Sequence, residues 1–273
     1  MDIHDTPVAL HSKSEIGFMA ESCELVSRTI ELVGKHIKPG ITTLELDEIA
    51  EEFIRSNGAE PAFKGYGGHG SVKPFPYTLC ISIDNEVVHG MPRHRTLEVG
   101  QIVSIDCGVK KNGFFGDSAF TFPVGVVSEQ KQKLLRITRE SLDAGVAQAV
   151  TGNTNYDIAK AVQQHVERNG FSVVRDLVGH GVGEELHQDP CVPNFVPGLL
   201  YKNRYPKTKL TQGMTIAIEP MVNTGTFQVH TASDGWTIVT NDGKPAAHFE
   251  HTVVVEAGKP VVLTYFPDQT TTM

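Results

Sequence analysis

The sequence of 273 residues lacks the features of small secreted domains and of membrane proteins. Its four cysteines are scattered and form no Cys-x-x-Cys pair, which favours free thiols in a reducing compartment over disulfides. No segment approaches the roughly 20 apolar residues of a membrane span. The N-terminus lacks the unbroken apolar stretch of a signal peptide. We therefore expect a soluble, cytoplasmic protein that does not bind membranes.

Basic residues are also in short supply, because 24 Lys and Arg face 32 Asp and Glu, a net charge of −8 with histidines neutral. A nucleic-acid-binding protein normally carries a basic face, so no nucleic acid is expected as a partner. The content of 40% apolar and 21% charged residues is that of an ordinary globular protein. An acidic surplus suits a protein that gathers carboxylates around cations.

An internal repeat organises the chain. Residues 40–58 (GITTLELDEIAEEFIRSNG) align with residues 152–170 (GNTNYDIAKAVQQHVERNG) at a constant offset of 112. Each copy predicts a Gly-led turn, an amphipathic helix and a Gly stop. A longer helix precedes each copy, which Ser12 or Ser14 can cap in the first half and Ser128 in the second. Chance similarity between helices is the alternative, but the end glycines stay in register, which favours a duplication.

Each helical pair is followed by β-rich stretches: 78–89, 101–110, 114–122, 172–178, 214–219, 235–240 and 247–255. This order predicts an α+β fold with helices covering one face of a mostly antiparallel sheet. We expect a single catalytic domain over residues 1–273, with pseudo-symmetric halves of about 12–127 and 128–262. A ligand site at their junction would draw residues from both. Two long irregular loops, 64–77 and 189–212, interrupt the pattern without dividing the chain.

A hairpin places two aspartates together. The Asn-Gly dipeptide at 112–113 is the strongest short signal for a type I′ turn. With these two loop residues, Gly108 faces Asp117 across the strands. Asp106 and Asp117 then lie on one sheet face as diagonal neighbours, with backbones roughly 7–8 Å apart. Gly108 is expected to leave room above the sheet. Solvated aspartates on an exposed face are the alternative interpretation.

Further acids and histidines lie in apolar or glycine-rich segments. Glu219 ends the strand MTIAIE, and Glu250 lies within AAHFEHTVVV, with no Lys or Arg in either. His180 lies in GHGVG, while His89 and His187 lie at strand-to-turn junctions beside Gly or Pro. Taken singly, each histidine is more often a structural or an exposed residue.

The acids and His180 together have the chemistry of a metal site. Four carboxylates and one imidazole carry about four negative charges, which two divalent cations would balance. Buried charges are normally paired or bound to metal, and an oxygen-rich site prefers harder ions such as Mn²⁺ or Fe²⁺. Two metals about 3.5–4 Å apart can share a nucleophilic hydroxide and polarise a carbonyl. No His-Glu-x-x-His helix is present, which excludes the corresponding single-zinc peptidase chemistry.

Six segments resemble the signature segments of the type I methionine aminopeptidases: NEVVHGMP, SIDCGV, GDSAFTF, GHGVGEELHQDP, TIAIEPMV and FEHTVVV. The resemblance spans about residues 12–260. It implies the pita-bread fold and hydrolytic removal of the initiator methionine from nascent proteins when the second residue is small. The ligand order is shared with prolidases and Xaa-Pro aminopeptidases, but those carry a large N-terminal domain that is not expected here. Only 31 residues separate Glu219 from Glu250, too few for the insert of type II enzymes, and Trp236 is as in type I.

The resemblance also implies a role for each site residue. Asp106 would chelate one metal, Asp117 and Glu250 would bridge both, and His180 and Glu219 would hold the other, with Glu219 relaying protons. It implies two divalent ions per chain, with Mn, Fe or Co ahead of Zn. As partners it implies the N-terminal Met of nascent polypeptides and a transient ribosome contact, and we expect a monomer.

His89 and His187 are implied to bind the substrate and stabilise the tetrahedral intermediate. By position, an apolar slot for methionine would be lined by Tyr66, Phe75, Cys80, His89, Leu186 and Trp236, with loop 64–77 at its rim. Ordinary core or loop packing is the alternative for each of these residues. A flexible thioether fits such a slot because sulfur makes favourable contacts with ring edges.

Three departures from the family pattern concern the substrate rather than the metal. Gly108 stands where many type I enzymes have Thr, loop 64–77 is longer than in the shorter bacterial members, and the zinc-binding extension of eukaryotic members is not expected here. Two other functions stay open. One is an Xaa-Pro peptidase on the same fold. The other is a non-enzymatic binding protein, although such relatives have lost ligands that are all present here.

Overall fold

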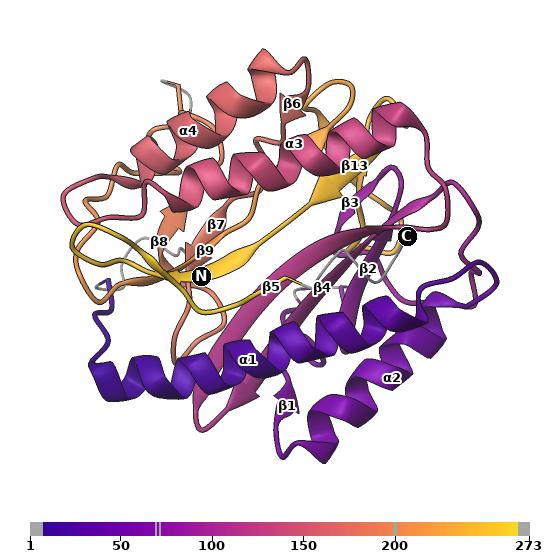
Figure 1. Cartoon of the computed structure of the whole chain (residues 1–273), viewed down its shortest axis with the longest axis horizontal. Coiled ribbons are helices and arrows are strands. Elements are labelled where there is room, and N and C mark those ends of the chain that lie inside the picture. Colours follow the sequence, from indigo (N-terminus) through magenta and orange to yellow (C-terminus); the bar gives the residue numbers. More distant parts are fainter. Residues whose placement is uncertain (1–7, 69, 71, 199–200, 267–273) are drawn as a thin grey trace.

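The computed structural model describes residues 8–68, 70, 72–198 and 201–266. Two helices, α1 (Lys13–His36) and α2 (Thr43–Ser56), lie along one side of the molecule, and α3 (Glu129–Val146) and α4 (Asn155–Arg168) lie along the other (Figure 1). Strands fill the space between the two pairs. None of the helices in the described ranges is long and apolar enough to span a bilayer.

The strands are short, apart from one long hairpin formed by β4 and β5. In chain order their bounds are β1 Glu60–Pro61, β2 Leu79–Ile83, β3 Glu86–Val88, β4 Ile102–Lys111, β5 Phe114–Pro123, β6 Ser172–Val173, β7 Gly179–Gly181, β8 Gln188–Val192, β9 Thr215–Ile218, β10 Met221–Asn223, β11 Val229–Thr231, β12 Ile238–Thr240, β13 Ala246–His248, β14 His251–Val254 and β15 Val261–Val262. Pairing between these strands is antiparallel throughout, as expected.

The strands hydrogen-bond in four groups: β1-β4-β2 with β5 on β4, β13-β10-β6, β11-β12-β3, and β15-β14-β9-β7-β8. Two expectations were wrong in detail. The stretch 172–178 is a strand only at residues 172–173, and the loop expected at 189–212 begins with β8. Strand β8 pairs with β7, which lies just before it in the chain, and its segment QDPCV contains a proline and no alternation of apolar and polar residues, so the sequence pattern missed this strand.

The helix pairs begin and end alike. The N–H of Thr42 donates to the Glu45 carboxylate (2.8 Å), and the N–H of Thr154 donates to the Asp157 carboxylate (2.8 Å). Positive φ angles follow at the expected stops, 68° at Gly58 and 82° at Gly170. Ser12 and Ser128 cap the longer helices, as predicted. We propose on these matched ends that the halves, about 12–127 and 128–262, arose by duplication within one catalytic domain.

The β4–β5 hairpin has the predicted turn and register. Asn112 (φ 52°) and Gly113 (φ 86°) both have positive φ, as a type I′ turn requires. Lys111 pairs with Phe114, and Gly108 pairs with Asp117. Helix α1 packs against this hairpin so closely that a Cβ on Gly116 would lie 2.6 Å from the backbone N of Cys23. Cys23 and the other three cysteines are free, as predicted, and all four are buried.

Strand β5 also joins the first half of the chain to the second. It runs antiparallel to residues 248–252: the Thr252 hydroxyl donates to the Asp117 carbonyl (2.7 Å), and the Glu250 N–H donates to the Ala119 carbonyl (2.9 Å). Backbone contacts therefore bring an acid of the first half next to an acid of the second. This junction is where the repeat predicts a ligand site.

Candidate metal centre

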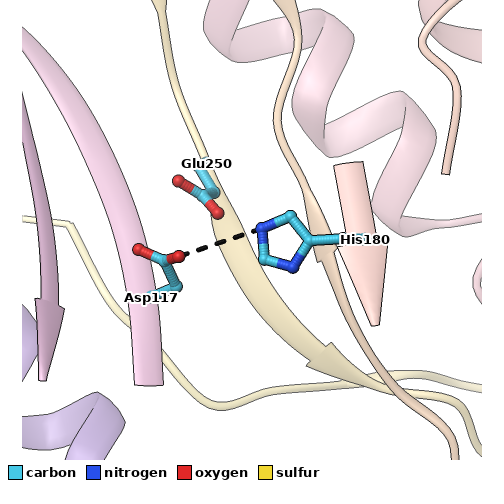
Figure 2. A group of neighbouring side chains, drawn as sticks. All are labelled: Asp117, His180 and Glu250. Atoms are coloured by element: carbon cyan, nitrogen blue, oxygen red, sulfur yellow. Dashed lines mark ion pairs between the residues drawn. The ribbon is translucent and has the colours of Figure 1, made fainter. Parts of the chain in front are cut away.

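Three side chains from three separate segments point toward one another at the junction (Figure 2). Asp117 on β5, His180 on β7 and Glu250 between β13 and β14 each offer one ligand atom, and these atoms all lie within 4.8 Å of one another. The distance from His180 Nε2 to Asp117 Oδ2 is 3.9 Å. All three residues are buried. The group has the chemistry and the spacing of a metal site.

The other two expected ligands border this group. Glu219 directly follows β9, and its Oε1 lies 3.5 Å from His180 Nε2. Asp106, on β4, shares the sheet face of Asp117, and its charge raises the pKa of the Asp117 carboxyl. The structure therefore brings Asp117, His180 and Glu250 together, with Glu219 beside His180 and Asp106 on the sheet face of Asp117.

The carboxylates lack compensating positive charge. Burial raises the pKa of Asp106 to about 8, and burial with mutual repulsion raises the pKa values of Asp117 and Glu250 well above their ordinary range. Burial lowers the pKa of His180 to about 4, so at neutral pH its imidazole is uncharged and can coordinate a metal. Within the described part of the chain, no Lys or Arg forms an ion pair with these acids.

Several carboxylate oxygens of these acids also lack a hydrogen-bond partner. Asp106 Oδ1, Asp117 Oδ1 and Glu250 Oε1 are buried without a hydrogen-bond partner. A buried polar atom left unpaired costs about 1–3 kcal/mol, and more when charged. Carboxylate oxygens together with a neutral imidazole are the donors that hard and borderline divalent cations accept. The residues present therefore fit a divalent metal.

His187 and His89 lie at the edge of this group. The His187 ring centroid is 4.2 Å from that of His180 and 5.0 Å from that of Tyr66. His187 Nδ1 is buried without a hydrogen-bond partner. Burial lowers the pKa of His187 well below its ordinary range and the pKa of His89 to about 4. His89 has a positive φ of 57°, a strained backbone state of the kind that clusters at functional sites.

An apolar cluster adjoins the acids. Phe75, Cys80 and Leu186 are buried in it, and Trp236 packs against it. Cys80 is the cross-strand partner of Asp106, so the apolar cluster and the acidic group share a sheet face. Four of the six residues expected to line the methionine slot thus lie in one cluster. The other two, Tyr66 and His89, lie outside it, and the Tyr66 ring contacts the His187 ring at a tilt of 44°.

The expected space above Gly108 is filled. A Cβ on Gly108 would lie 2.6 Å from Cε1 of Phe63 and 2.9 Å from Cβ of Ala62. Both residues belong to the apolar cluster. The cross-strand partners of Gly108 could be read from the hairpin, but the side chains that pack above it could not, so this prediction was wrong.

Comparison with known protein families identifies the family to which the chain belongs. Metallopeptidase family M24 matches residues 17–257, most of the chain. The chain belongs to this family. As an M24 member it is a metallopeptidase that uses a divalent metal, in agreement with the cluster of carboxylates and His180.

Curated relatives of the M24 chain are named for one activity. It is 50% identical over 258 residues to "Methionine aminopeptidase" of Clostridium perfringens, covering 94% of this chain and 98% of the relative. It is also 50% identical over 241 residues to "Methionine aminopeptidase 1" of Bacillus subtilis, covering 88% and 92%.

Solved structures agree on the fold. Methionine aminopeptidase from Thermotoga maritima matches with a TM-score of 0.88 at 39% identity, over 94% of this chain and 99% of that one. Prolidase from Pyrococcus furiosus matches with a TM-score of 0.76 at 22% identity, over 96% and 66%, which shows a shared fold alone. The expected α+β pita-bread fold is confirmed.

Sequence reasoning missed several residues beside the site. His248 lies 3.8 Å from Glu219 and 4.0 Å from Glu250, measured from its Nε2. The only available signal was its position two residues before Glu250, which places both on one side of an extended strand. Phe63 and Phe115 join the apolar cluster without any signal in the sequence.

Proposed function

We propose that the chain is a methionine aminopeptidase, which hydrolyses the first peptide bond of nascent proteins and releases the initiator methionine. The observation that carries this proposal is the cross-strand pair of Cys80 and Asp106, which puts an apolar cluster directly beside the acidic group. A substrate peptide whose first side chain lies in the apolar cluster presents its first peptide bond to the acidic group. Curated relatives of nearly the same length bear the name of this activity.

The proposed ligands of two divalent ions are the five gathered residues. Asp106 would hold one ion, His180 and Glu219 would hold the other, and Asp117 and Glu250 would serve both. The predominance of carboxylates favours Mn²⁺ or Fe²⁺, followed by Co²⁺, with Zn²⁺ as the alternative. When bound, the ions supply Lewis-acid activation of water and of the scissile carbonyl.

Three side chains of the chain itself handle protons and substrate in this proposal. Glu219 has a raised pKa because of burial, so its carboxyl can take a proton from the attacking water and pass it to the leaving amine. His187 stabilises the carbonyl oxygen as negative charge develops on it. His89 binds the peptide beside the first bond. Its positive φ and the close packing of Gly90 against the Ile81 backbone hold its main chain in place.

Selectivity for methionine follows from the apolar cluster. Phe75 meets the Trp236 ring edge-on at 5.3 Å, and the Trp236 indole N–H donates to the Lys73 carbonyl (3.0 Å), which fixes the wall formed by loop 64–77. A rigid aromatic wall suits an unbranched thioether. Crowding by His89 and the acids leaves space for only a small second residue, such as Gly, Ala or Ser.

We also propose a compartment, a partner and an oligomeric state for the enzyme. Four free, buried cysteines fit a reducing compartment, so we place the enzyme in the cytoplasm. Its substrate there is the N-terminus of a chain leaving the ribosome, which requires a transient ribosome contact. A monomer suffices, because the proposed ligands and the apolar cluster come from one chain.

A peptide assay tests this proposal. Metal-free protein is reconstituted in turn with Mn²⁺, Fe²⁺, Co²⁺ or Zn²⁺, and kcat/KM is measured for Met-Ala-Ser, Met-Arg-Ser and Leu-Ala-Ser. Efficient cleavage of the first peptide alone is expected. Norleucine-Ala-Ser should be cut slowly, since an apolar pocket discriminates by about 1–3 kcal/mol per methylene. Cleavage of Xaa-Pro dipeptides with indifference to Met-Ala-Ser would replace the proposal with a prolidase.

A further inference from the structure

His248 is a buried histidine that the proposed mechanism does not use. It is 2% exposed, and neither of its ring nitrogens has a hydrogen-bond partner. Unpartnered buried polar atoms are rare in folded proteins and call for an explanation. A histidine held only for packing would be replaceable by an apolar residue without leaving such atoms.

The backbone of His248 is held in place from two directions. Its N–H donates to the Thr121 hydroxyl (3.0 Å), which in turn donates to the His248 carbonyl (2.7 Å). On its other side His248 pairs with Met221 in the β10–β13 ladder, two residues after Glu219. The ring is therefore presented to the end of β9 from a fixed backbone.

The ring nitrogen Nε2 faces two carboxylates. It lies 3.8 Å from Glu219 Oε2 and 4.0 Å from Glu250 Oε2. The other oxygen of Glu219, Oε1, lies 3.5 Å from His180 Nε2. The Glu219 carboxylate is thus bracketed by two imidazoles, one on each oxygen, while the Asn194 side chain donates to its backbone carbonyl (3.0 Å).

We propose that His248 is a positioning residue: its Nε2 lies 3.8 Å from Glu219 Oε2, and a small shift on metal binding brings Nε2–H within hydrogen-bond range, so that it orients this carboxylate toward the metal. The inference rests on the proposed function, because it needs Glu219 as a ligand. Groups that hydrogen-bond to metal ligands fix the ligands' direction, and their loss typically weakens metal affinity about 10–100-fold. Glu219 is the partner rather than Glu250 because its oxygen is nearer.

His248 is not itself assigned as a ligand. The group whose ligand atoms all lie within 4.8 Å of one another contains Asp117, His180 and Glu250. Glu219 and Asp106 lie outside this group too, so His248 is set apart by its contact: its Nε2 lies 3.8 Å from Glu219 Oε2, whereas His180 Nε2 lies 3.5 Å from Oε1. Its place is behind Glu219 rather than among the atoms that converge.

Two substitutions at position 248 test the proposal. His248→Leu keeps the volume but removes the donor, whereas His248→Gln keeps an N–H donor near the position of Nε2. Metal-free proteins are titrated with Mn²⁺ by calorimetry. We expect His248→Leu to raise the Mn²⁺ dissociation constant about 10–100-fold with unchanged stoichiometry, and His248→Gln to stay near the wild type. The kcat for Met-Ala-Ser should fall in His248→Leu with KM unchanged, because the apolar cluster does not include His248.

His251→Leu is the matched control. His251 is also a buried histidine, but its Nδ1 pairs with the Thr264 hydroxyl (2.7 Å) and its ring stacks on Phe266. Its loss should lower thermal stability without changing Mn²⁺ affinity, which separates positioning from general loss of a buried ring.

The outcomes distinguish a failure of the His248 inference from a failure of the proposed function. Wild-type Mn²⁺ affinity in folded His248→Leu would overturn the inference while leaving the proposed function standing. Loss of one equivalent of bound metal in both His248 variants would also overturn it, because His248 would then be a ligand. If the wild type bound no Mn²⁺ and cut no peptide, the proposed function itself would fall, and the inference with it.

Discussion

At the scale of single residues, the β4–β5 hairpin holds two acids on one face, while side chains from another segment pack above it. The turn at Asn112-Gly113 fixes the register, so the placement of Asp106 and Asp117 on one face followed from the sequence. The side chain above Gly108 did not, because Phe63 reaches it from a segment that no local pattern connects to β4. His248 was missed for the same reason. Register is local, whereas packing between sheets is not.

Gly108 provides a prediction about this packing. Gly108→Ala should destabilise the protein by about 1–3 kcal/mol, the usual cost of overpacking, because the new Cβ would meet Phe63 and Ala62. Displacement of Phe63 in the apolar cluster should also raise KM for Met-Ala-Ser. Urea unfolding and peptide kinetics measure the two effects.

Two further variants control the Gly108 experiment. Phe63→Leu in the Gly108→Ala background should recover part of the stability, as expected for residues in contact. Gly17→Ala, at an open position of α1, should be neutral or stabilising. If Gly108→Ala had wild-type stability and KM, close packing between position 108 and Phe63 would not constrain the apolar cluster.

His187 provides a prediction about catalysis. His187→Ala should lower kcat about 10²–10⁴-fold, the scale of losing an acid–base or oxyanion partner. Metal stoichiometry should stay intact, because His187, whose ring packs beside that of His180, is proposed to contact the substrate and not the metal. Elemental analysis alongside kinetics checks both, with the exposed His230→Ala as control. A loss of metal would make His187 a ligand instead.

At the scale of elements, the helices were predictable because their signals are local. The caps at Ser12 and Ser128 and the glycine stops lie within the helices' own segments. The division of the strands into four groups was not predictable from the sequence. Which strands pair, and where one sheet ends and the next begins, depends on contacts between residues distant in sequence. Asp47 is one such connection: its Oδ1 accepts the N–H groups of Thr78 (2.9 Å) and Leu79 (2.8 Å), which ties α2 to the start of β2.

Asp47 should make stability depend on pH. Burial raises its pKa from 3.8 to about 6. A carboxyl whose pKa is raised on folding stabilises the protein below its unfolded pKa, and this contribution is lost as pH rises through about 6. The wild type should therefore lose on the order of 2 kcal/mol between pH 4 and 6 relative to Asp47→Asn, which keeps the acceptor oxygen but cannot ionise.

Urea unfolding of the two metal-free proteins at several pH values measures this difference. Asp47→Ala is the companion variant, and it should be less stable at every pH because two buried N–H groups lose their acceptor, at about 1–3 kcal/mol each. Parallel pH profiles for the wild type and Asp47→Asn would show that Asp47 does not titrate in this window.

At the scale of the whole molecule, the metal centre and the contact between halves are the same feature. Asp106 and Asp117 come from the first half, and His180, Glu219 and Glu250 come from the second. Hydrogen bonds between strand β5 and residues 248–252 bring Asp117 next to Glu250, a contact that the repeat could not specify in detail. A cation at this place would hold the halves together, whereas without it the buried acids repel one another.

Metal removal should therefore destabilise the whole protein. At a free metal concentration about 100-fold above the dissociation constant, binding stabilises the folded state by about 2.7 kcal/mol, which corresponds to a shift in Tm of about 5–10 °C for a chain of this size. Glu250→Gln should lose most of this shift. Its metal-free Tm should nevertheless equal or exceed that of the metal-free wild type, because one of the repelling buried charges is gone. Calorimetric scans with Mn²⁺ or with a chelator measure both effects, and the exposed Glu98→Gln should keep the wild-type shift. An equal Mn²⁺-dependent shift in Glu250→Gln would place the cation elsewhere.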